Sequence, residues 1–571
     1  MKTRAKTADL NADVLVAGSG AAGMAAALAA AERGVRVILA DRSLIGRGGA
    51  TVMAQMTVAA ALGEEVPDHW EAHLADTMAA GRGLCEADLA ALVCEEGPRD
   101  IRQLDEWNIG WARRSDGRLR QVHAPGHDRP RCVYVDFLAT GPAVSKTLRA
   151  RLQRQQRITR IGDLYITDVV VRDGTACGAL GFSVADGRAV AIAASAVVLA
   201  TGGLTRLYGR NSASANMTGN GHALALQAGA ELMDMEFVQF FPIGHLAPRL
   251  VGMDPIMWDP FRYKLGGRLL NSEKREFLND YGVEERGRYV ATRDHATHSI
   301  LKEVEAGRGS PAGGVYLSFQ HVPENKLREA FGPVIDRLAR NGIDLTKMPV
   351  EVAPIAHYHM GGVRVDPTME TRVPNLFAAG ELVAGANGAN RLSGNAITEA
   401  LVFGRRAGEA AATRAKTAAS AVPNEIASPE QLEPLCASTG DPAHNLAGMI
   451  LELQGLVADV AGPSRNEKGL EQGLLKLAQM RVAIGEVPPG RPGPYNLVRV
   501  DWFDLRSMLI VAEVIMRSAC LRTESRGAHQ RDDFPLLDNS WAQHQIVSLR
   551  DGALAFERAP VANGEVAKVS S

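Results

Sequence analysis

Two short segments carry the residues best suited to chemistry. Residues 357–362 read His-Tyr-His-Met-Gly-Gly, and residues 385–395 read Gly-Ala-Asn-Gly-Ala-Asn-Arg-Leu-Ser-Gly-Asn. The planar guanidinium of Arg391 can hold a carboxylate by two parallel hydrogen bonds. His357 and His359 supply two further polar side chains. The segments suggest a site for an acidic small molecule, and the rest of the chain must position them.

The start of the chain predicts a dinucleotide-binding unit. Residues 13–17 are an apolar run typical of a buried parallel strand, and Gly-Ser-Gly-Ala-Ala-Gly follows over residues 18–23. An Ala-rich helix over 24–32 and a second strand over 35–40 come next. The glycines permit a tight turn, close approach of a pyrophosphate and close helix packing. We expect the pyrophosphate at the helix N-terminus and Asp41, at the end of the second strand, on a ribose hydroxyl.

Two later junctions indicate that the dinucleotide is FAD. Residues 196–203 and 375–381 both read as a strand that ends in a glycine turn, as in two-dinucleotide-fold flavoproteins. With the segments around His357 and Arg391, these features resemble the flavoprotein subunit of the succinate dehydrogenase, fumarate reductase and L-aspartate oxidase superfamily. The resemblance runs from about residue 11 to about residue 540, nearly the whole chain.

The resemblance implies an α/β fold: a Rossmann-type, two-dinucleotide-fold-like FAD domain with an inserted α+β capping domain and a C-terminal helical domain. We expect the FAD domain over 1–241 and 351–416, the capping domain over 242–350, the helical domain over 417–545 and a tail over 546–571. The capping domain should close over the substrate and exclude water. Apolar spacing near three to four predicts helices over 470–484 and 505–521.

The same resemblance places the cofactor contacts. Residues 47–55 match the family's isoalloxazine loop, where many respiratory members attach the flavin to a histidine; here the best match is Ala50, and no histidine occurs before residue 69. We therefore expect non-covalent FAD. The family's aspartate in residues 218–221 is replaced by Asn220, and an acid placed like Glu381 binds the ribityl or ribose part. The expected cofactor-binding residues are Gly18, Ser19, Gly20, Ala22, Gly23, Asp41, Arg42, Gly49, Ala50, Thr51, Ala54, Gln55, Thr201, Gly202, Asn220, Glu381, Arg391, Ser393, Asn395 and Ala396.

Arg391 and His357 match the family positions that bind a substrate carboxylate near flavin N5. Other substrate positions differ: Phe241 stands where the family has a histidine, and residues 252–264 replace the dicarboxylate-binding loop with a sequence rich in aromatics. A second carboxylate would lose its partner there, so we expect a more apolar or aromatic substrate with one acidic group. Phe241, Trp258 and His359 are the expected pocket residues. One alternative is that the aromatics Phe241, Trp258, Phe261 and Tyr263 only pack the cap, and another is that His359 only packs. Arg262 and Lys264 are further candidates for anion contacts.

Residues 293–300 resemble the helix that carries the family's proton-shuttle arginine. His298 takes the place of that arginine, so we expect it to donate or accept the proton, with His295 as the second candidate. The alternative is that both histidines are simply exposed to solvent or structural.

Composition limits the partners. The formal net charge of −2 gives no reason to expect nucleic acid or an acidic membrane surface. Six cysteines without a Cys-x-x-Cys pair argue against an iron–sulfur cluster or another metal site in this chain. No apolar stretch approaches a membrane span, and residues 1–11 lack a signal peptide, so we expect a cytoplasmic protein.

The sequence thus predicts an FAD-dependent dehydrogenase or reductase of a carboxylate-bearing substrate other than plain succinate or fumarate. Electrons would pass to a separate iron–sulfur, ferredoxin-like subunit, to oxygen or to a soluble acceptor. Three alternatives stay open: an L-aspartate-oxidase-like amino-acid oxidase, a sulfur-oxyanion enzyme resembling adenylylsulfate reductase, and a non-catalytic flavin-binding subunit.

Overall fold

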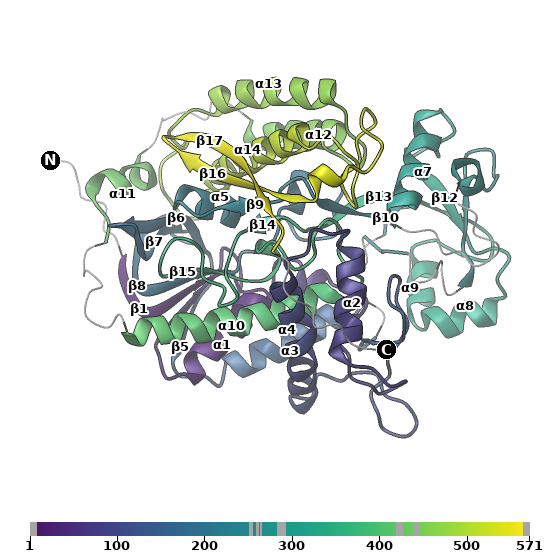
Figure 1. Ribbon diagram of the computed structural model, residues 1–571, viewed down its shortest axis with the longest axis horizontal. Helices are drawn as coiled ribbons and strands as arrows, with labels where there is room; N and C mark the ends of the chain where they lie inside the picture. Colours follow the sequence, from purple (N-terminus) through teal and green to yellow (C-terminus); the bar gives the residue numbers. More distant parts are fainter. Residues whose placement is uncertain are drawn as a thin grey trace. The chain divides into compact units, whose positions relative to one another are not determined.

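The computed structural model divides into two units (Figure 1). Unit 1 comprises Met1–Gly209, Ala213–Phe237 and His359–Ser571, and unit 2 comprises Arg210–Ser212 and Val238–Tyr358. The residues that the structure describes are 8–136, 138–250, 255–258, 262, 265–282, 293–417, 426–437 and 445–562.

A seven-stranded sheet is the centre of unit 1. Its order is β5-β2-β1-β8-β7-β6, and β15 also pairs with β8. Neighbours are parallel from β5 to β8 and between β8 and β15, whereas β6, β7 and β8 are antiparallel. The strands are β1 (Ala8–Ala17), β2 (Val37–Ala40), β5 (Ile158–Ile161), β6 (Leu164–Arg172), β7 (Thr175–Ser183), β8 (Ala189–Leu199) and β15 (Leu376–Ala378).

The register of this sheet brings three strand ends together. Ala17 of β1 is opposite Leu199 of β8, and Leu199 is opposite Ala378 of β15. The next residues continue the ladder, because Ala200 N–H donates to Ala17 O at 2.8 Å and Ala379 N–H donates to Leu199 O at 2.9 Å. The loops that follow all three strands therefore begin at the same carboxyl edge, where open α/β sheets bind ligands.

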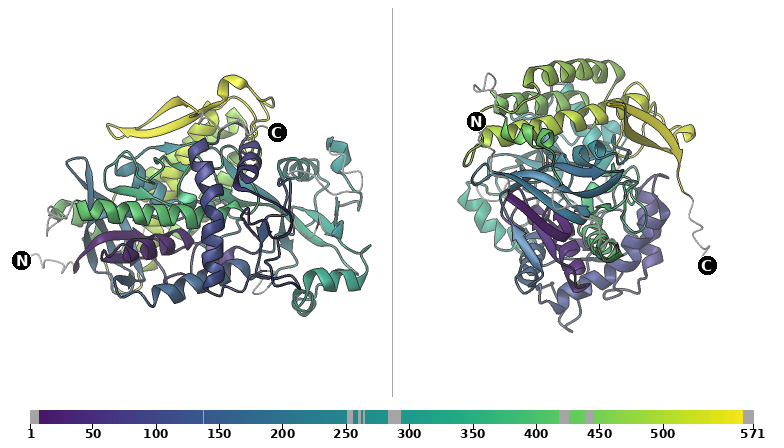
Figure 2. Two further views of the ribbon diagram at one scale, coloured as in Figure 1. Left: turned by 60° about the horizontal axis from the view of Figure 1, so that its bottom comes forward. Right: turned by 90° about the vertical axis from the view of Figure 1, so that its left-hand side faces the viewer.

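Helices cover both faces of the sheet. α1 (Ala21–Glu32) and α10 (Asn395–Thr417) lie side by side on one face, which Figures 1 and 2 show in purple and green. They approach closely because of glycines in α10: a Cβ added at Gly404 would lie 2.3 Å from Ala22 O. Nearby helices of unit 1 are α2 (Trp70–Ala80), α3 (Ala87–Glu106) and α4 (Thr140–Leu152), whereas α5 (Asn220–Gln227) packs against α14 (Leu497–Leu521).

The opposite face carries helices from the C-terminal part, α12 (Leu446–Val460), α13 (Glu467–Ile484) and α14 (Leu497–Leu521) (Figure 1). An asparagine starts each of them, because its side chain accepts a hydrogen bond from the backbone N–H three residues on. The helices predicted over 470–484 and 505–521 are confirmed inside α13 and α14. A shorter helix, α11 (Pro429–Cys436), precedes them.

The segment after residue 543 differs from the expectation. β16 (Gln543–Arg550) and β17 (Ala553–Pro560) form an antiparallel hairpin, so residues 546–560 are not part of a tail. β16 also pairs with β9 (Leu232–Met233), which pairs with β14 (Gly362–Val363). Residues 543–550 do not alternate between apolar and polar side chains, so their sequence carries no clear strand pattern. The prediction for residues 563–571 lies outside the described residues.

Unit 2 is built on a four-stranded sheet in the order β10-β13-β12-β11. Its strands are β10 (Val238–Ala247), β11 (Arg268–Leu270), β12 (Val315–Ser318) and β13 (Val350–His359). Its helices include α7 (Arg293–Glu305), α8 (Glu324–Phe331) and α9 (Val334–Arg340).

The predicted fold class, a Rossmann-type α/β domain with an inserted α+β part and C-terminal helices, is confirmed. Among the parts of the chain that the structure describes, no helix is both long enough and apolar enough to cross a membrane.

Candidate active site

The turn after β1 admits only glycine at its key positions. Gly18 has φ +101°, and a Cβ there would lie 2.3 Å from Ala200 O. A Cβ on Gly23 would lie 1.9 Å from Gly18 O. These contacts press the start of α1 against the carboxyl ends of β1 and β8. The first N–H groups of a helix have no partner within it. Here the N–H groups of Ser19 and Ala21 donate to Asp41 and Thr51, so the remaining amides of this turn would be the donors for a pyrophosphate.

Asp41 has a role in shaping this turn. Its Oδ2 accepts from the N–H and the hydroxyl of Ser19, at 2.8 and 2.6 Å. Its Oδ1 accepts from the N–H and the hydroxyl of Ser43, both at 2.8 Å. These four bonds fill the acceptor capacity of a carboxylate. The expected bond from a ribose hydroxyl to Asp41 stays a prediction and would have to replace one of them.

Arg42, which we expected to contact the cofactor, binds another part of the protein instead. Its two terminal nitrogens donate to Asp504 of α14 at 2.6 and 2.7 Å, and its guanidinium lies 4.9 Å from the ring centre of Tyr165. Such a bidentate pair is among the stronger protein hydrogen bonds. The guanidinium expected on the cofactor therefore has a protein partner, and we leave Arg42 out of the proposed cofactor ligands.

The loop expected to face the isoalloxazine begins beside α1. Thr51 Oγ1 accepts from Ala21 N–H at 3.0 Å, which satisfies the first amide of α1. Gly49 N–H donates to Ser214 Oγ at 2.8 Å, and Ala54 O accepts from Gly141 N–H at 2.8 Å. Ala50 starts the short 3₁₀ turn Thr51–Met53, and Gln55 is buried.

The loops after β8 and β15 meet each other. A Cβ added to Gly203 would lie 2.2 Å from Glu381 Oε1, and that oxygen accepts from His359 N–H at 3.2 Å. Burial raises the pKa of Glu381 to about 8. Among the described residues, nothing hydrogen-bonds the buried hydroxyl of Thr201. Glycine turns and an unsatisfied buried hydroxyl at one edge fit the demands of a dinucleotide such as FAD.

Two further cofactor candidates stand at helix starts in unit 1. Asn220 is the first residue of α5, and its amide nitrogen lies 3.5 Å from Ser507 Oγ. Asn395 is the first residue of α10, followed by Ala396, so the N-terminus of α10 directly follows Ser393. Arg391 is buried in the same segment, and its Nη1 donates to Leu392 O at 3.2 Å.

His357 belongs to unit 2. Its Nδ1 lies 2.7 Å from Ser212 Oγ, and its ring meets that of Phe241 edge-on with centres 5.4 Å apart. Phe241 is itself buried. The serine and the phenylalanine thus fix the orientation of His357. No sequence motif singled out Ser212, because its position beside His357 arises from the pairing of Asn211 with Ala356.

His359 packs inside unit 1. Its side chain is fully buried in unit 1, with Nε2 3.1 Å from Met235 O and its ring edge-on to His222 at 5.4 Å. Burial lowers the pKa of His359 to about 4, which keeps the ring neutral. The packing alternative therefore describes this residue better.

Trp258 likewise belongs to a core. It is fully buried in unit 2, its indole N–H donates to His245 Nδ1 at 3.1 Å, and its ring lies about 6 Å from those of Phe319 and Phe331. A tryptophan enclosed in this way stabilises the unit, as the packing alternative expects. We therefore remove it from the expected pocket.

The remaining candidate residues of the sequence analysis lie on α7 or between residues 261 and 264. His298 and His295 are both exposed on α7. Arg262 is buried in unit 2. Phe261, Tyr263 and Lys264 lie outside the described residues.

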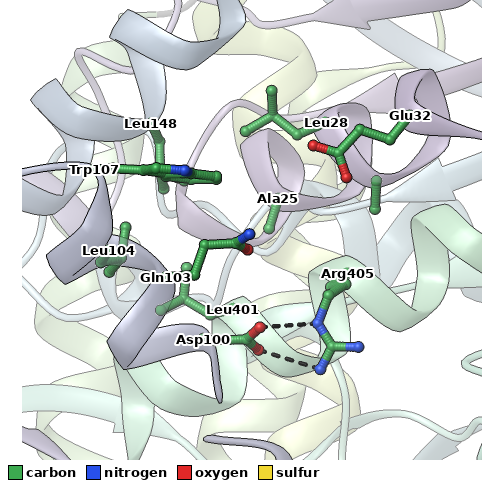
Figure 3. Close-up of a pocket in the computed structure, with 11 residues that line it drawn as sticks. Ala25, Leu28, Glu32, Asp100, Gln103, Leu104, Trp107, Leu148, Leu401 and Arg405 are labelled. Carbon is green, nitrogen blue, oxygen red and sulfur yellow. Dashed lines mark hydrogen bonds and ion pairs between the residues drawn. The ribbon is translucent and has the colours of Figure 1, made fainter. Parts of the chain in front are cut away.

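One cavity in unit 1 is separate from these groups. It holds about 40 Å³ and lies on the helical layer, where Leu28, Leu104 and Trp107 supply apolar walls (Figure 3). Its charged residues are Glu32, Asp100 and Arg405, of which the last two bind each other, with Arg405 Nε donating to Asp100 Oδ1 at 2.9 Å. The pair satisfies itself, and the volume suits water rather than a substrate.

Comparisons with known proteins agree with this geometry. Residues 13–397 match the family model described as FAD binding domain, and residues 450–570 match the one described as fumarate reductase flavoprotein C-term. One chain of the CoM/CoB fumarate reductase of Methanothermobacter marburgensis is 35% identical, covering 94% of this chain and 97% of the relative. L-aspartate oxidase of Streptomyces coelicolor is 34% identical, with coverages of 94% and 91%. A solved E. coli quinol fumarate reductase superposes with a TM-score of 0.88 at 31% identity, covering 97% of each chain.

The chain belongs to the succinate dehydrogenase and fumarate reductase flavoprotein family. It is an FAD-dependent oxidoreductase.

Proposed function

We propose that this enzyme dehydrogenates, or reduces at a C=C bond, a substrate that carries one carboxylate and an apolar or aromatic remainder. The observation that carries the substrate class is the packing of Phe241 against His357, with ring centres 5.4 Å apart. The apolar ring of Phe241 cannot hydrogen-bond a second carboxylate at the position where the family has a histidine, and a buried charge without a partner is strongly disfavoured.

FAD, when bound, supplies the hydride acceptor or donor. Gly18, Gly23, Thr201 and Glu381 meet at the carboxyl edge of the sheet and would hold it. We propose non-covalent binding, because Ala50 occupies the loop where a histidine would be needed. Asn395 and Ala396 place the α10 N-terminus beside Ser393, and its partial positive charge would stabilise negative charge on the reduced flavin.

Arg391 and His357 are the proposed carboxylate ligands. Arg391 supplies a permanent positive charge in a buried setting, where charge-assisted hydrogen bonds are strong. His357 has its Nδ1 engaged by Ser212, which fixes which ring nitrogen serves the substrate. His298 is the proposed proton donor or acceptor. What supports this role is its place on α7, the segment that resembles the family's proton-shuttle helix, where His298 replaces the arginine.

A second candidate is an L-aspartate-oxidase-like amino-acid oxidase, since such an enzyme is 34% identical over nearly the full length. Several relatives bear names of subunits, so we also propose a separate iron–sulfur protein as electron partner. The cytoplasmic location stays a prediction.

The test is anaerobic mixing of the purified holoenzyme with single compounds, followed at the flavin absorbance band. The panel contains succinate, L-aspartate, phenylpropionate, isovalerate and sulfite. Bleaching by a mono-acid supports the proposal, whereas bleaching by succinate contradicts the substrate class. Bleaching by L-aspartate, followed by peroxide release in air, indicates an amino-acid oxidase. A flavin–sulfite adduct without activity on the other compounds indicates a sulfur-oxyanion enzyme.

Arg391→Gln is the matching variant. We expect the mono-acid that bleaches wild-type flavin to bind at least 10-fold more weakly, because a charge-assisted bond contributes about 1.5–3 kcal/mol. Unchanged affinity would remove Arg391 from the carboxylate site. If Arg391→Gln alters only the copurification of another protein and no redox activity is found, the chain is a non-catalytic flavin-binding subunit.

A further inference from the structure

Two buried histidines hold the segment that carries Arg391. His73, on α2, places Nε2 2.8 Å from Asn395 Oδ1. His127 places Nε2 2.7 Å from Ser393 O. Between these contacts, Ala59 N–H donates to Gly394 O at 3.0 Å. Three consecutive residues at the start of α10 are thus each fixed by a hydrogen bond from the same side, all within unit 1.

The hydrogen-bond donors of this arrangement are determined by its neighbours. Asn395 Nδ2 donates to Thr77 Oγ1 at 3.1 Å, and that hydroxyl donates to His73 O at 2.9 Å. The amide oxygen of Asn395 is therefore the acceptor, and His73 Nε2 must carry the proton. His73 and Thr77 are four residues apart on α2, which places both on one face of the helix.

The tautomer of the His127 ring is also determined by a neighbour, Arg131. The fully buried Arg131 directs Nη1 to His127 Nδ1 at 3.3 Å. A guanidinium can only donate, so Nδ1 accepts and Nε2–H is left to donate to Ser393 O. Arg131 is held by three carboxylates: Nε lies 3.1 Å from Asp68, Nη2 lies 2.8 Å from Asp128, and Nη1 contacts Asp76.

Both histidines stay neutral near neutral pH, so neither is suited to act as an acid or base. Burial lowers the pKa of His127 to about 3 and that of His73 to about 4, and the charge of Arg131 acts in the same direction. Both rings are therefore neutral donors throughout the range in which enzymes work. A neutral ring with one fixed N–H is a rigid hydrogen-bond donor, which is what a positioning residue requires.

We propose that His127, locked by Arg131, and His73 are positioning residues that hold residues 393–395 and thereby orient Arg391 and the N-terminus of α10. This inference rests on the proposed role of Arg391 in carboxylate binding. Neither histidine contacts the substrate. Arg391 is two residues before Ser393, so freeing the Ser393 carbonyl lets the guanidinium sample orientations that do not bind a carboxylate.

The first measurement is deuterium uptake by the holoenzyme in peptides that cover residues 385–396. We expect the amides of 391–396 to exchange at least 10-fold faster in His127→Leu than in the wild type. His127→Gln should restore slow exchange, because its amide N–H can replace Nε2–H. His69→Gln is the control, an exposed histidine just before α2. Unchanged exchange in a folded His127→Leu holoenzyme would overturn the proposal.

The second measurement uses phenylacetate, titrated into each holoenzyme and followed by the flavin difference spectrum. We expect about 10-fold weaker binding in His127→Leu, recovery in His127→Gln, and the same pH dependence from pH 6 to 8 in His127→Gln as in the wild type. If Arg391→Gln weakens binding but His127→Leu does not, the positioning role is wrong. If Arg391→Gln has no effect on phenylacetate, the proposed function fails, and deuterium uptake still decides whether the histidines hold the segment.

Discussion

Ser212 Oγ lies 2.7 Å from Nδ1 of His357, and this contact fixes one ring nitrogen of the proposed carboxylate ligand. Ser212→Ala should lower kcat/KM for the mono-acid substrate by about 5- to 10-fold, because a net hydrogen bond contributes about 1 kcal/mol. Ser212→Thr keeps the hydroxyl and should retain most of the activity. Steady-state kinetics are the measurement, with the exposed Ser272→Ala as control. Equal losses in the alanine and threonine variants would contradict an orienting hydroxyl.

In our proposal, Phe241 is the residue that disfavours substrates with a second carboxylate. Phe241→His would place a polar ring beside His357, at a position now filled by an aromatic ring 5.4 Å away. We expect succinate oxidation to rise at least 10-fold over the wild-type level, while kcat/KM for the mono-acid falls. Phe241→Leu should lower the mono-acid activity without any gain on succinate. A variant that gains nothing on succinate would show that other residues exclude the second carboxylate.

The flavin should be released by denaturation. Residues 1–68 contain no histidine, and Ala50 stands in the loop expected to face the flavin, so that loop offers no imidazole for a covalent bond. Precipitation with trichloroacetic acid should leave more than about nine tenths of the FAD in the supernatant. The flavin absorbance of supernatant and pellet is the measurement. A fluorescent protein band on a denaturing gel would contradict the prediction.

We expect His544 to make the free energy of unfolding decrease as the pH rises from neutral to alkaline values. Burial disfavours its charged form, but Asp234 Oδ2 at 2.5 Å and Glu86 Oε1 at 2.9 Å outweigh this and raise the pKa of His544 to about 10. A raised pKa stabilises the fold fully below the unfolded value near 6.5, and the contribution is lost as the pH rises toward 10.

Thermal unfolding between pH 6.5 and 10 measures this effect. The wild type should lose stability by at most about 1.4 kcal/mol per pH unit from this one group. His544→Gln should be less stable than the wild type at pH 6.5, and the difference should shrink toward pH 10. Parallel curves for the two proteins would exclude a charged His544 in the fold.

Local sequence patterns predicted the strands and the helix around the expected dinucleotide turn well. A strand, a glycine turn, a helix and a second strand follow one another within residues 8–40, so short-range geometry determines them. The ends of β8 and β15 were readable for the same reason. Asp41 was placed correctly at the end of β2, yet its bonds to Ser19 and Ser43 depend on a turn whose shape the motif does not specify.

The parts that sequence reasoning missed depend on contacts far apart in the chain. Ser212 meets His357 across 145 residues, and His127 meets Ser393 across 266. Such pairs leave no local spacing to recognise. Trp258 and His359 were expected in a pocket because they match substrate positions of the resembled family, but such a match does not distinguish a pocket wall from a core.

The branching of the sheet at β8 has a consequence for synthesis of the protein. β8 ends at Leu199, but its parallel neighbour β15 starts at Leu376, after the whole of unit 2 has been translated. A nascent chain that stops before residue 381 has the pyrophosphate turn but lacks Glu381 and the start of α10. The ribosome must therefore synthesise roughly two thirds of the chain before the proposed set of flavin ligands is complete. Long-range closure of this kind is slow, so flavin supply should govern the yield of folded enzyme late in translation rather than early.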